Sequence, residues 1–118
     1  MIQVTPHMRI LICCKDIDFR KGMDGLAQVC RSNLKADPMS GAMFVFRNRS
    51  KTCVKVLVYD GQGFWLCHKR LSSGRFKWWP TTQDEGAFNL SAQALQVLLS
   101  AGNPMETTTL PDWRPLIS

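Results

Sequence analysis

Two repeating patterns of apolar and polar residues divide the 118-residue chain into short elements. Five runs rich in β-branched and aromatic residues predict strands: Met8–Cys14, Phe44–Arg49, Val54–Tyr59, Phe64–Leu71 and Arg75–Trp79. Turn signals separate the last four runs, so we expect a four-stranded antiparallel meander that ends at Pro80. Asp60-Gly61 predicts a two-residue hairpin turn, and a longer bulged loop through Gly63 is the alternative.

A period of about 3.6 residues marks two helices. In the first, the apolar positions that repeat at intervals of three and four are Met23, Leu26, Ala27, Cys30 and Leu34. Asp18 or Asp24 is expected near its start, as an N-cap or as a charge that suits the helix dipole. The second helix is predicted over Ala92–Ala101, with Ser91 as its N-cap. The predicted fold is therefore α+β: a mainly antiparallel β-sheet, the hairpin meander, with two short helices. We expect residues 1–104 to form a single domain and residues 105–118 to form a loosely ordered tail.

The formal net charge of +6 is concentrated in the strand-rich region. Its cations are Arg47, Arg49, Lys51, Lys55, Lys69, Arg70, Arg75 and Lys77, and Asp60 is the one acid in the same span. Since side chains alternate across a strand, Arg47 with Arg49 and Arg75 with Lys77 are each predicted to share a face. Such a cationic face is either an ordinary solvated surface or a surface that binds the phosphates of a nucleic acid.

The residues predicted to contact DNA combine these strands with the entry to the first helix. They are Arg20, Lys21, Arg47, Arg49, Lys55, Lys69, Arg70, Arg75, Lys77 and Trp78. The helix entry resembles an anion site, although pairing of Arg20 with a neighbouring aspartate is the favoured interpretation. The phosphate-binding glycine patterns of nucleotide sites are absent. A tryptophan could stack on an unpaired base if exposed, but we expect at least two of Trp65, Trp78 and Trp79 to be buried.

Other classes of chemistry find little support in the sequence. Five cysteines without a C-x-x-C spacing, and two histidines without neighbouring ligands, predict buried reduced thiols and no metal site or cofactor. Carboxylates for a two-metal nuclease are present at Asp16, Asp18, Asp24, Asp60, Asp84 and Glu85. Turn and capping roles account for several of them, so we expect no catalytic residues and no enzyme. No apolar run approaches the ~20 residues that cross a bilayer, and no leader pattern is recognisable, which predicts a cytoplasmic protein without a membrane partner.

Several blocks of the sequence form a recognisable combination. DFRKGMDGL at residues 18–26 is similar to the signature D-x-R-K-G-x-D-G-L, and further blocks fit in order: FVFRNR, KVL with DGQGFW, KRL with GRF, and the helix at 90–102. Together they resemble the TnpB-type, second-reading-frame protein of the insertion-sequence-sixty-six family, a bacterial insertion-sequence accessory family. The likeness covers residues 8–102. Trp78-Trp79-Pro80 departs from the family's R-F-x-W-P by one extra tryptophan.

The resemblance implies a non-catalytic accessory protein that assists a separate DDE-type transposase. Its expected protein partners are the cognate transposase and another helper protein encoded by the element. The net charge and the basic strands favour DNA, bound through the basic sheet face, as a further partner. The alternative is a protein–protein bridging module of the transposition complex without direct DNA contact. Trp113 in the tail would suit that alternative, because aromatic anchors concentrate binding energy at interfaces.

Overall fold

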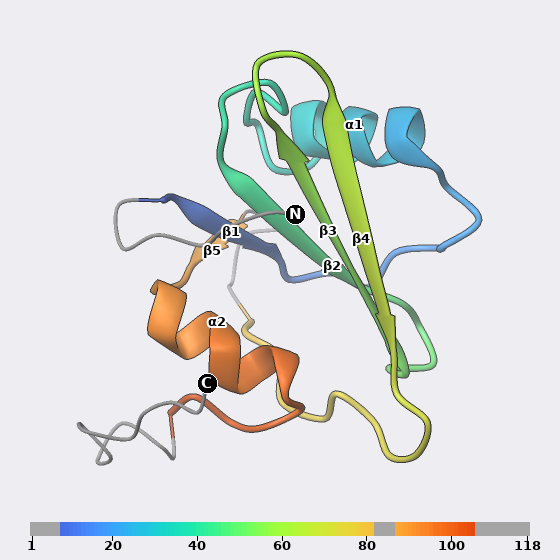
Figure 1. The fold of residues 1–118 in the computed structure, drawn as a ribbon. Helices are drawn as coiled ribbons and strands as arrows, with labels where there is room; N and C mark the ends of the chain where they lie inside the picture. Colours follow the sequence, from blue (N-terminus) through green and yellow to red (C-terminus); the bar gives the residue numbers. More distant parts are fainter. Residues whose placement is uncertain (1–7, 82–86, 106–118) are drawn as a thin grey trace.

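The computed structural model describes residues 8–81 and 87–105 (Figure 1). Its elements are β1 (Ile10–Cys13), α1 (Met23–Ser32), β2 (Met43–Arg47), β3 (Cys53–Tyr59), β4 (Phe64–Arg70), β5 (Ala87–Asn89) and α2 (Ala92–Leu99). The strands form one sheet in the order β4-β3-β2-β1-β5. β1 and β2 run parallel, and every other neighbouring pair is antiparallel. The predicted α+β class with a mainly antiparallel sheet is confirmed.

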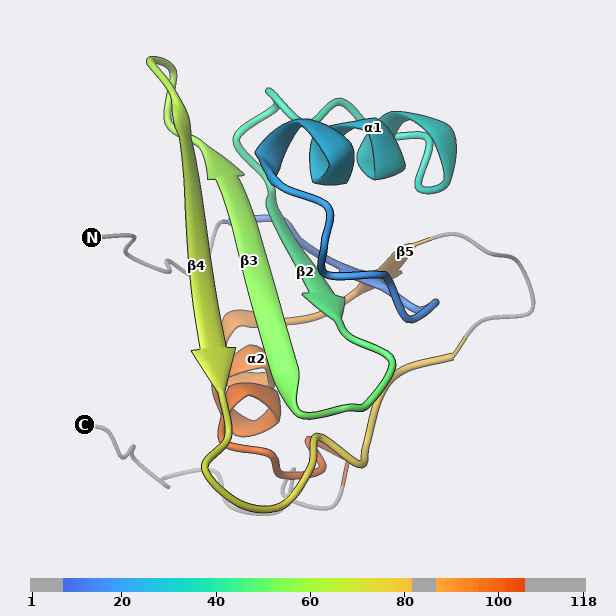
Figure 2. The same cartoon turned by 90° about the vertical axis from the view of Figure 1, so that its right-hand side faces the viewer.

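The two helices cover opposite faces of the sheet, as Figures 1 and 2 show. Ile10 and Ile12 of β1 point to the α2 face, where they pack with Leu95 and Leu98. The intervening Leu11 points to the α1 face. α1 contributes Leu26, Ala27, Val29 and Cys30 to that second cluster. Because both faces of β1 are covered, all four of its residues are apolar and buried.

The ends of the helices follow local rules. The N-cap residue of α1 is Gly22, so no side chain caps this helix. Asp24 lies in the first turn of α1, where its negative charge is favourable to the helix dipole. The N-cap of α2 is Ser91 as predicted, and its hydroxyl oxygen accepts the Ala94 N–H at 3.0 Å. α2 ends at Leu99, because Ala101 has a positive φ of 65° and cannot continue the helix.

The hairpin meander is confirmed for β2, β3 and β4. β3 and β4 pair along their whole length, from Cys53↔Arg70 to Tyr59↔Phe64. The turn between them spans residues 60–63, because Asp60 N donates to Gly63 O at 3.0 Å, and Gly61 has a positive φ of 96°. The turn therefore extends to Gly63, as the alternative predicted, and is not the two-residue turn at Asp60-Gly61. One oxygen of the Asp60 carboxylate accepts hydrogen bonds from the backbone N–H groups of Gln62 and Gly63, each at 2.9 Å. These bonds lower the pKa of Asp60, since they stabilise its charged form.

The predicted fourth strand at Arg75–Trp79 is wrong. This segment belongs to a loop, residues 71–80, that crosses one end of the sheet. Its alternation is real, with Phe76 buried between exposed Arg75 and Lys77. However, among the described residues it makes one backbone–backbone hydrogen bond to the rest of the fold, from Phe76 N to Lys51 O at 2.7 Å, so no ladder forms. Alternating burial therefore reflects how the loop packs and not a strand.

β5 was not predicted from the sequence. It has three residues, too few for a period of two to be recognised, and it pairs antiparallel with β1 from Leu11↔Asn89 to Cys13↔Ala87. The predictions for the tail, including Trp113, and for Asp84 and Glu85 lie outside the described residues. Within 8–81 and 87–105, no helix has the length and apolar character needed to cross a membrane.

Candidate nucleic-acid interface

Three segments that are separate in sequence meet at one end of the sheet (Figure 2). They are the β2–β3 turn at residues 48–52, the last residues of β4, and the loop that follows β4. Leu71 N donates to Thr52 O at 2.9 Å, and this bond joins the turn to the end of β4. We call this region the basic end of the sheet and define it by its exposed cations: Arg49, Lys51, Arg70, Arg75 and Lys77.

Asn48 organises the turn that carries two of these cations. Its side-chain oxygen accepts the N–H groups of Thr52 and Cys53, both at 3.0 Å. Lys51 has a φ of 66°, a left-handed conformation that a side chain other than glycine adopts at a cost. In this conformation Lys51 O accepts a hydrogen bond from Phe76 N, in the loop at residues 71–80, while the ammonium group of Lys51 stays exposed. The turn thus holds Arg49 and Lys51 outward.

Arg47 does not lie on an exposed face, so that part of the predicted cationic surface is wrong. Its side chain is 8% exposed, and Nε donates to Asp16 Oδ1 at 2.8 Å. One terminal nitrogen donates to Phe76 O at 2.8 Å, and the guanidinium lies 4.9 Å from the centre of the Trp79 ring. β2 is buried on both faces, so even its last residue points inward. Arg47 therefore fixes the loop of the basic end against the sheet.

Lys55 is buried as well, and its predicted place on the exposed face is wrong in the same way. Its ammonium group donates to Phe19 O at 3.0 Å and to Lys21 O at 3.3 Å. It also lies 4.8 Å from the centre of the Phe19 ring. Lys55 thus holds the segment before α1 against β3. At Gly25, in the first turn of α1, a Cβ would lie 2.9 Å from Lys21 Cβ, so the close approach of this segment to the helix favours glycine there.

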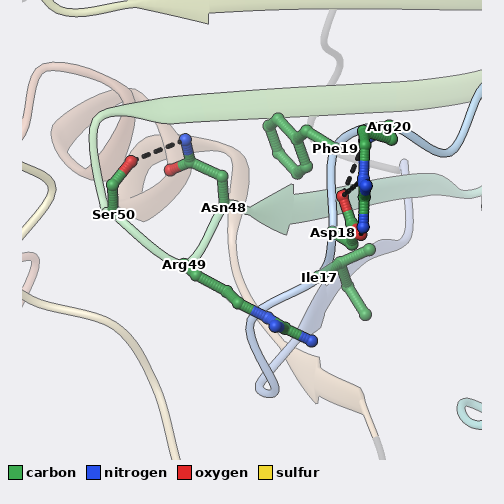
Figure 3. Close-up of a pocket in the computed structure, with 7 residues that line it drawn as sticks. All are labelled: Ile17, Asp18, Phe19, Arg20, Asn48, Arg49 and Ser50. Atoms are coloured by element: carbon green, nitrogen blue, oxygen red, sulfur yellow. Dashed lines mark hydrogen bonds and ion pairs between the residues drawn. The ribbon is translucent and has the colours of Figure 1, made fainter.

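Arg20 and Arg49 line one shallow pocket from opposite sides. The lining residues are Ile17, Asp18, Phe19, Arg20, Asn48, Arg49 and Ser50 (Figure 3). Arg20 forms the expected pair with an aspartate, Asp18, at 2.7 Å, although its side chain is 91% exposed. Hydrogen bonds from Arg20 hold the pKa of Asp18 well below its ordinary range, and Arg49 adds to this effect. Lys21, which follows Arg20 in the sequence, is also exposed.

The remaining predicted cations fall on two sides of β4. Arg70, Arg75 and Lys77 line a second depression together with the polar loop residues Ser72 and Ser73. Lys69 is exposed but points elsewhere, since its ammonium group donates to Leu99 O at the C-terminus of α2 at 2.7 Å. A cation is favourable at that position because the carbonyl end of a helix carries partial negative charge.

The three central tryptophans occupy three different environments. Trp79 is buried, and its indole N–H donates to Cys13 O at 2.9 Å. Trp78 is half-buried against the cluster on the α2 face. Trp65 is 44% exposed, and its indole N–H donates to Asp60 at 2.8 Å, at the opposite end of β4 from the basic end. The expectation that at least two would be buried is wrong, and the exposed one lies away from the basic end.

Among the described residues, the cysteine, aspartate and glutamate side chains form no metal-binding cluster. Cys13, Cys30 and Cys53 are buried as expected, whereas Cys67 is exposed on β4. Burial raises the pKa of Cys13 to about 11 and that of Cys30 to about 12, because desolvation disfavours the thiolate. In the part of the chain that the structure describes, no group of three or more His, Cys, Asp or Glu side chains could hold a metal ion.

Sequence reasoning found most of the exposed cations but not what positions them. The sequence pattern places Lys51 among the cations without marking it as a DNA contact, and it places Asn48 in a strand. The run Asn48-Arg49-Ser50-Lys51 is polar throughout, which is typical of a turn, and that signal could have ended the strand earlier. β2 does end at Arg47.

Comparison with known proteins places the chain in a family. The family described as "IS66 Orf2 like protein" matches residues 8–108. An uncharacterized protein, y4hO of Sinorhizobium fredii (strain NBRC 101917 / NGR234), is 38% identical over 118 residues, which cover 98% of this chain and 96% of that protein. A second uncharacterized protein of the same strain, y4jC, is 33% identical over 115 residues, covering 98% and 97%. No solved structure matches the chain. The family match spans every described residue and shows that the chain belongs to the IS66 Orf2-like family of insertion-sequence accessory proteins.

Proposed function

We propose that this accessory protein binds DNA through the basic end of the sheet and thereby assists the transposase of its element. The observation that carries the proposal is that Arg70, Arg75 and Lys77 line one depression. Backbone hydrogen bonds from Leu71 N to Thr52 O and from Phe76 N to Lys51 O join this depression to the turn that carries the exposed Arg49 and Lys51. In residues 48–81, the single acid is Asp60, which lies in the turn at the other end of β3 and β4. Asp18 shares a pocket with Arg49, but Asp18 is paired with Arg20 at 2.7 Å. The cations of the basic end therefore outnumber the nearby acids and create a local positive potential that attracts phosphates.

Buried contacts favour a preformed surface over a set of independent flexible side chains. Arg47 fastens the loop that carries Arg75 and Lys77, through its bond to Phe76 O. Asn48 fixes the turn that carries Arg49 and Lys51. Because the backbone is already ordered, binding loses less conformational entropy than it would on a mobile loop. Arg47 and Lys55 thus support the surface from inside and make no contact with DNA.

The chemistry of the surface favours recognition of the DNA backbone. Lys and Arg side chains that approach phosphates position a protein without reading sequence, whereas base reading needs an element that enters a groove. The basic end is made of a turn, a strand end and a loop. The exposed aromatic, Trp65, lies at the opposite end of β4. We therefore expect binding to element-end DNA and to scrambled DNA with similar affinity.

Fluorescence anisotropy of labelled duplexes tests the proposal. A variant with alanine at Arg49, Lys51, Arg75 and Lys77 should bind at least tenfold more weakly than the wild type, since each phosphate contact adds to the counterion-release term. The matched control removes four cations from other surfaces, at Lys15, Arg31, Lys35 and Arg9, all of them exposed. Both variants carry the same net charge.

Equal weakening in the two variants would show that net charge alone attracts the DNA, and it would contradict a site at the basic end. Absence of binding by the wild type would reject DNA binding altogether. That result would favour the bridging role, which is tested by co-purification with the transposase after nuclease treatment.

A further inference from the structure

β4 is an edge strand whose outer side has no partner among the described residues. It is seven residues long, pairs with β3 on one side, and has no other strand or helix beyond it in Figures 1 and 2. A strand edge presents N–H and C=O groups that can pair with another chain. Most of its side chains are exposed, including Trp65, Cys67 and His68.

The pairing with β3 determines which backbone groups point outward. Asp60 N donates to Gly63 O, and Leu71 N donates to Thr52 O, so residues 63 and 71 both bond towards β3. In an antiparallel ladder the bonded residues alternate. Residues 65, 67 and 69 therefore also bond towards β3, and the N–H and C=O groups of the even-numbered residues point outward. These are Phe64, Leu66, His68 and Arg70.

The sequence of β4 is arranged so that it complements itself when reversed. Its first three residues are apolar, Phe64-Trp65-Leu66, and its last three are basic or titratable, His68-Lys69-Arg70, with Cys67 at the centre. A parallel pair of such strands would place the basic ends together, which is unfavourable. An antiparallel pair centred on Cys67 places each basic end beside the partner's aromatic end, where cations over aromatic rings are favourable.

We propose that β4 pairs antiparallel with β4 of a second copy of this chain, centred on Cys67, and joins two sheets into one dimer. In this register Leu66 faces His68 of the partner and Phe64 faces Arg70 of the partner. The two-fold symmetry repeats each of these pairs once. In all four resulting pairs the two residues exchange their outward-pointing N–H and C=O groups, as a bonded antiparallel ladder requires. Trp65 faces Lys69 of the partner in a closer, non-bonded pair. A two-fold axis through Cys67 makes the contact closed, which limits assembly to a dimer.

The dimer does not rest on the proposed function, but it has a consequence for it. Since β4 runs from the Asp60 turn to the basic end, the antiparallel partner carries its basic end at the other extremity of the joined strands. Seven residues of strand span about 23 Å at ~3.3 Å per residue. Two basic ends held apart in this way would contact separate stretches of DNA.

The register can be read by cross-linking. In a non-bonded antiparallel pair the Cα atoms lie about 4.5 Å apart, which is within disulfide range. Oxidised glutathione should convert two Cys67 thiols into one disulfide, and its own disulfide is reduced to two glutathione thiols, which take up the two electrons and the two protons. In a Cys67→Ser background, Trp65→Cys chains mixed with Lys69→Cys chains should cross-link. Trp65→Cys alone should not, because those residues lie about 13 Å apart in this register.

Size-exclusion chromatography with light scattering over a series of wild-type concentrations gives the oligomeric state. We expect a dimer that dissociates on dilution. His68→Pro should be folded and monomeric, because proline removes an N–H that points outward and none that bonds to β3. Trp65→Lys should also be monomeric, since it faces Lys69 of the partner, and adding Lys69→Glu should restore the dimer.

Three results would overturn the inference. One is a wild-type monomer at every concentration, which would leave the edge to a different partner or to none. Another is a His68→Pro variant that is folded and still dimeric, which would place the interface elsewhere. The third is a dimer in which Trp65→Cys and Lys69→Cys chains do not cross-link, which would reject the register.

Discussion

Removal of Asp16 should destabilise this protein more than removal of Arg47, although the two residues form one ion pair. The Arg47 side chain is 8% exposed and that of Asp16 is 26% exposed, and they meet at 2.8 Å. Without Asp16, a buried guanidinium keeps its charge and retains only its bond to Phe76 O and its contact with Trp79. Without Arg47, the more exposed carboxylate can be hydrated.

The expected magnitudes follow from this asymmetry. Breaking a buried pair by removing one partner costs about 3–5 kcal/mol when an uncompensated charge stays behind. Because Arg47 keeps one carbonyl acceptor and a ring contact, we expect Asp16→Ala to lower the free energy of unfolding by about 2–3 kcal/mol. Arg47→Met preserves much of the apolar stem and should lower the free energy of unfolding by about 1–2 kcal/mol, mainly because Asp16 and Phe76 O lose their hydrogen-bond donor.

A double-mutant cycle by urea unfolding measures the coupling. The double variant should be about as stable as Arg47→Met alone, since Asp16 has nothing left to pair with. Arg20→Ala is the control, because Arg20 pairs with Asp18 at the surface with 91% exposure, and its urea midpoint should not change. If the two single losses add in the double variant, or if Asp16→Ala has no effect, then Arg47 does not depend on Asp16 as described.

Three further outcomes test the supports around the site. Lys55→Met should cost about 1–3 kcal/mol in urea unfolding, because two carbonyl oxygens lose their buried donor; an unchanged midpoint would mean that water replaces it. Gly25→Ala should lower the midpoint despite the better helix propensity of alanine, since its Cβ would meet Lys21 Cβ at 2.9 Å; Gly22→Ala, with open space around it, is the matched control. The lowered pKa of Asp60 means that its stabilising effect is complete above the ordinary aspartate pKa of about 3.9 and is lost as the pH falls towards its folded value. The urea midpoints of wild type and Asp60→Ala should therefore differ at neutral pH and converge in acid, and a constant difference would contradict this.

The elements that could be predicted are those whose local chemistry agrees with their packing. The position of the hairpin turn, with Gly61 at a positive φ, and the Ser91 cap could be predicted, because each depends on residues within a few positions. The exact turn differs, since it spans residues 60–63. The Arg75–Trp79 segment misled the prediction, since burial of Phe76 between exposed cations imitates a strand. Only the tertiary fold decides whether such a segment finds a partner for a ladder.

The candidate site shows the same division. Arg49, Arg75 and Lys77 could be assigned to the surface from their charge, and they are exposed. Arg47 and Lys55 could not be placed, because charged residues are rarely buried and their partners are distant in sequence: Asp16 lies 31 positions from Arg47, and Phe19 lies 36 positions from Lys55. Spacing on a strand does not reveal such long-range contacts.

The salt dependence of DNA binding tests the central claim most directly. The logarithm of the association constant should fall linearly with the logarithm of salt concentration, with a slope of about −0.9 for each phosphate that the protein neutralises. Alanine at Arg49, Lys51, Arg75 and Lys77 should make that slope shallower by about one for each cation that contacts a phosphate. The control variant, with alanine at Arg9, Lys15, Arg31 and Lys35, should keep the wild-type slope. A slope that is the same in the wild type and the basic-end variant, or binding that does not respond to salt, would contradict a phosphate-binding site at the basic end of the sheet.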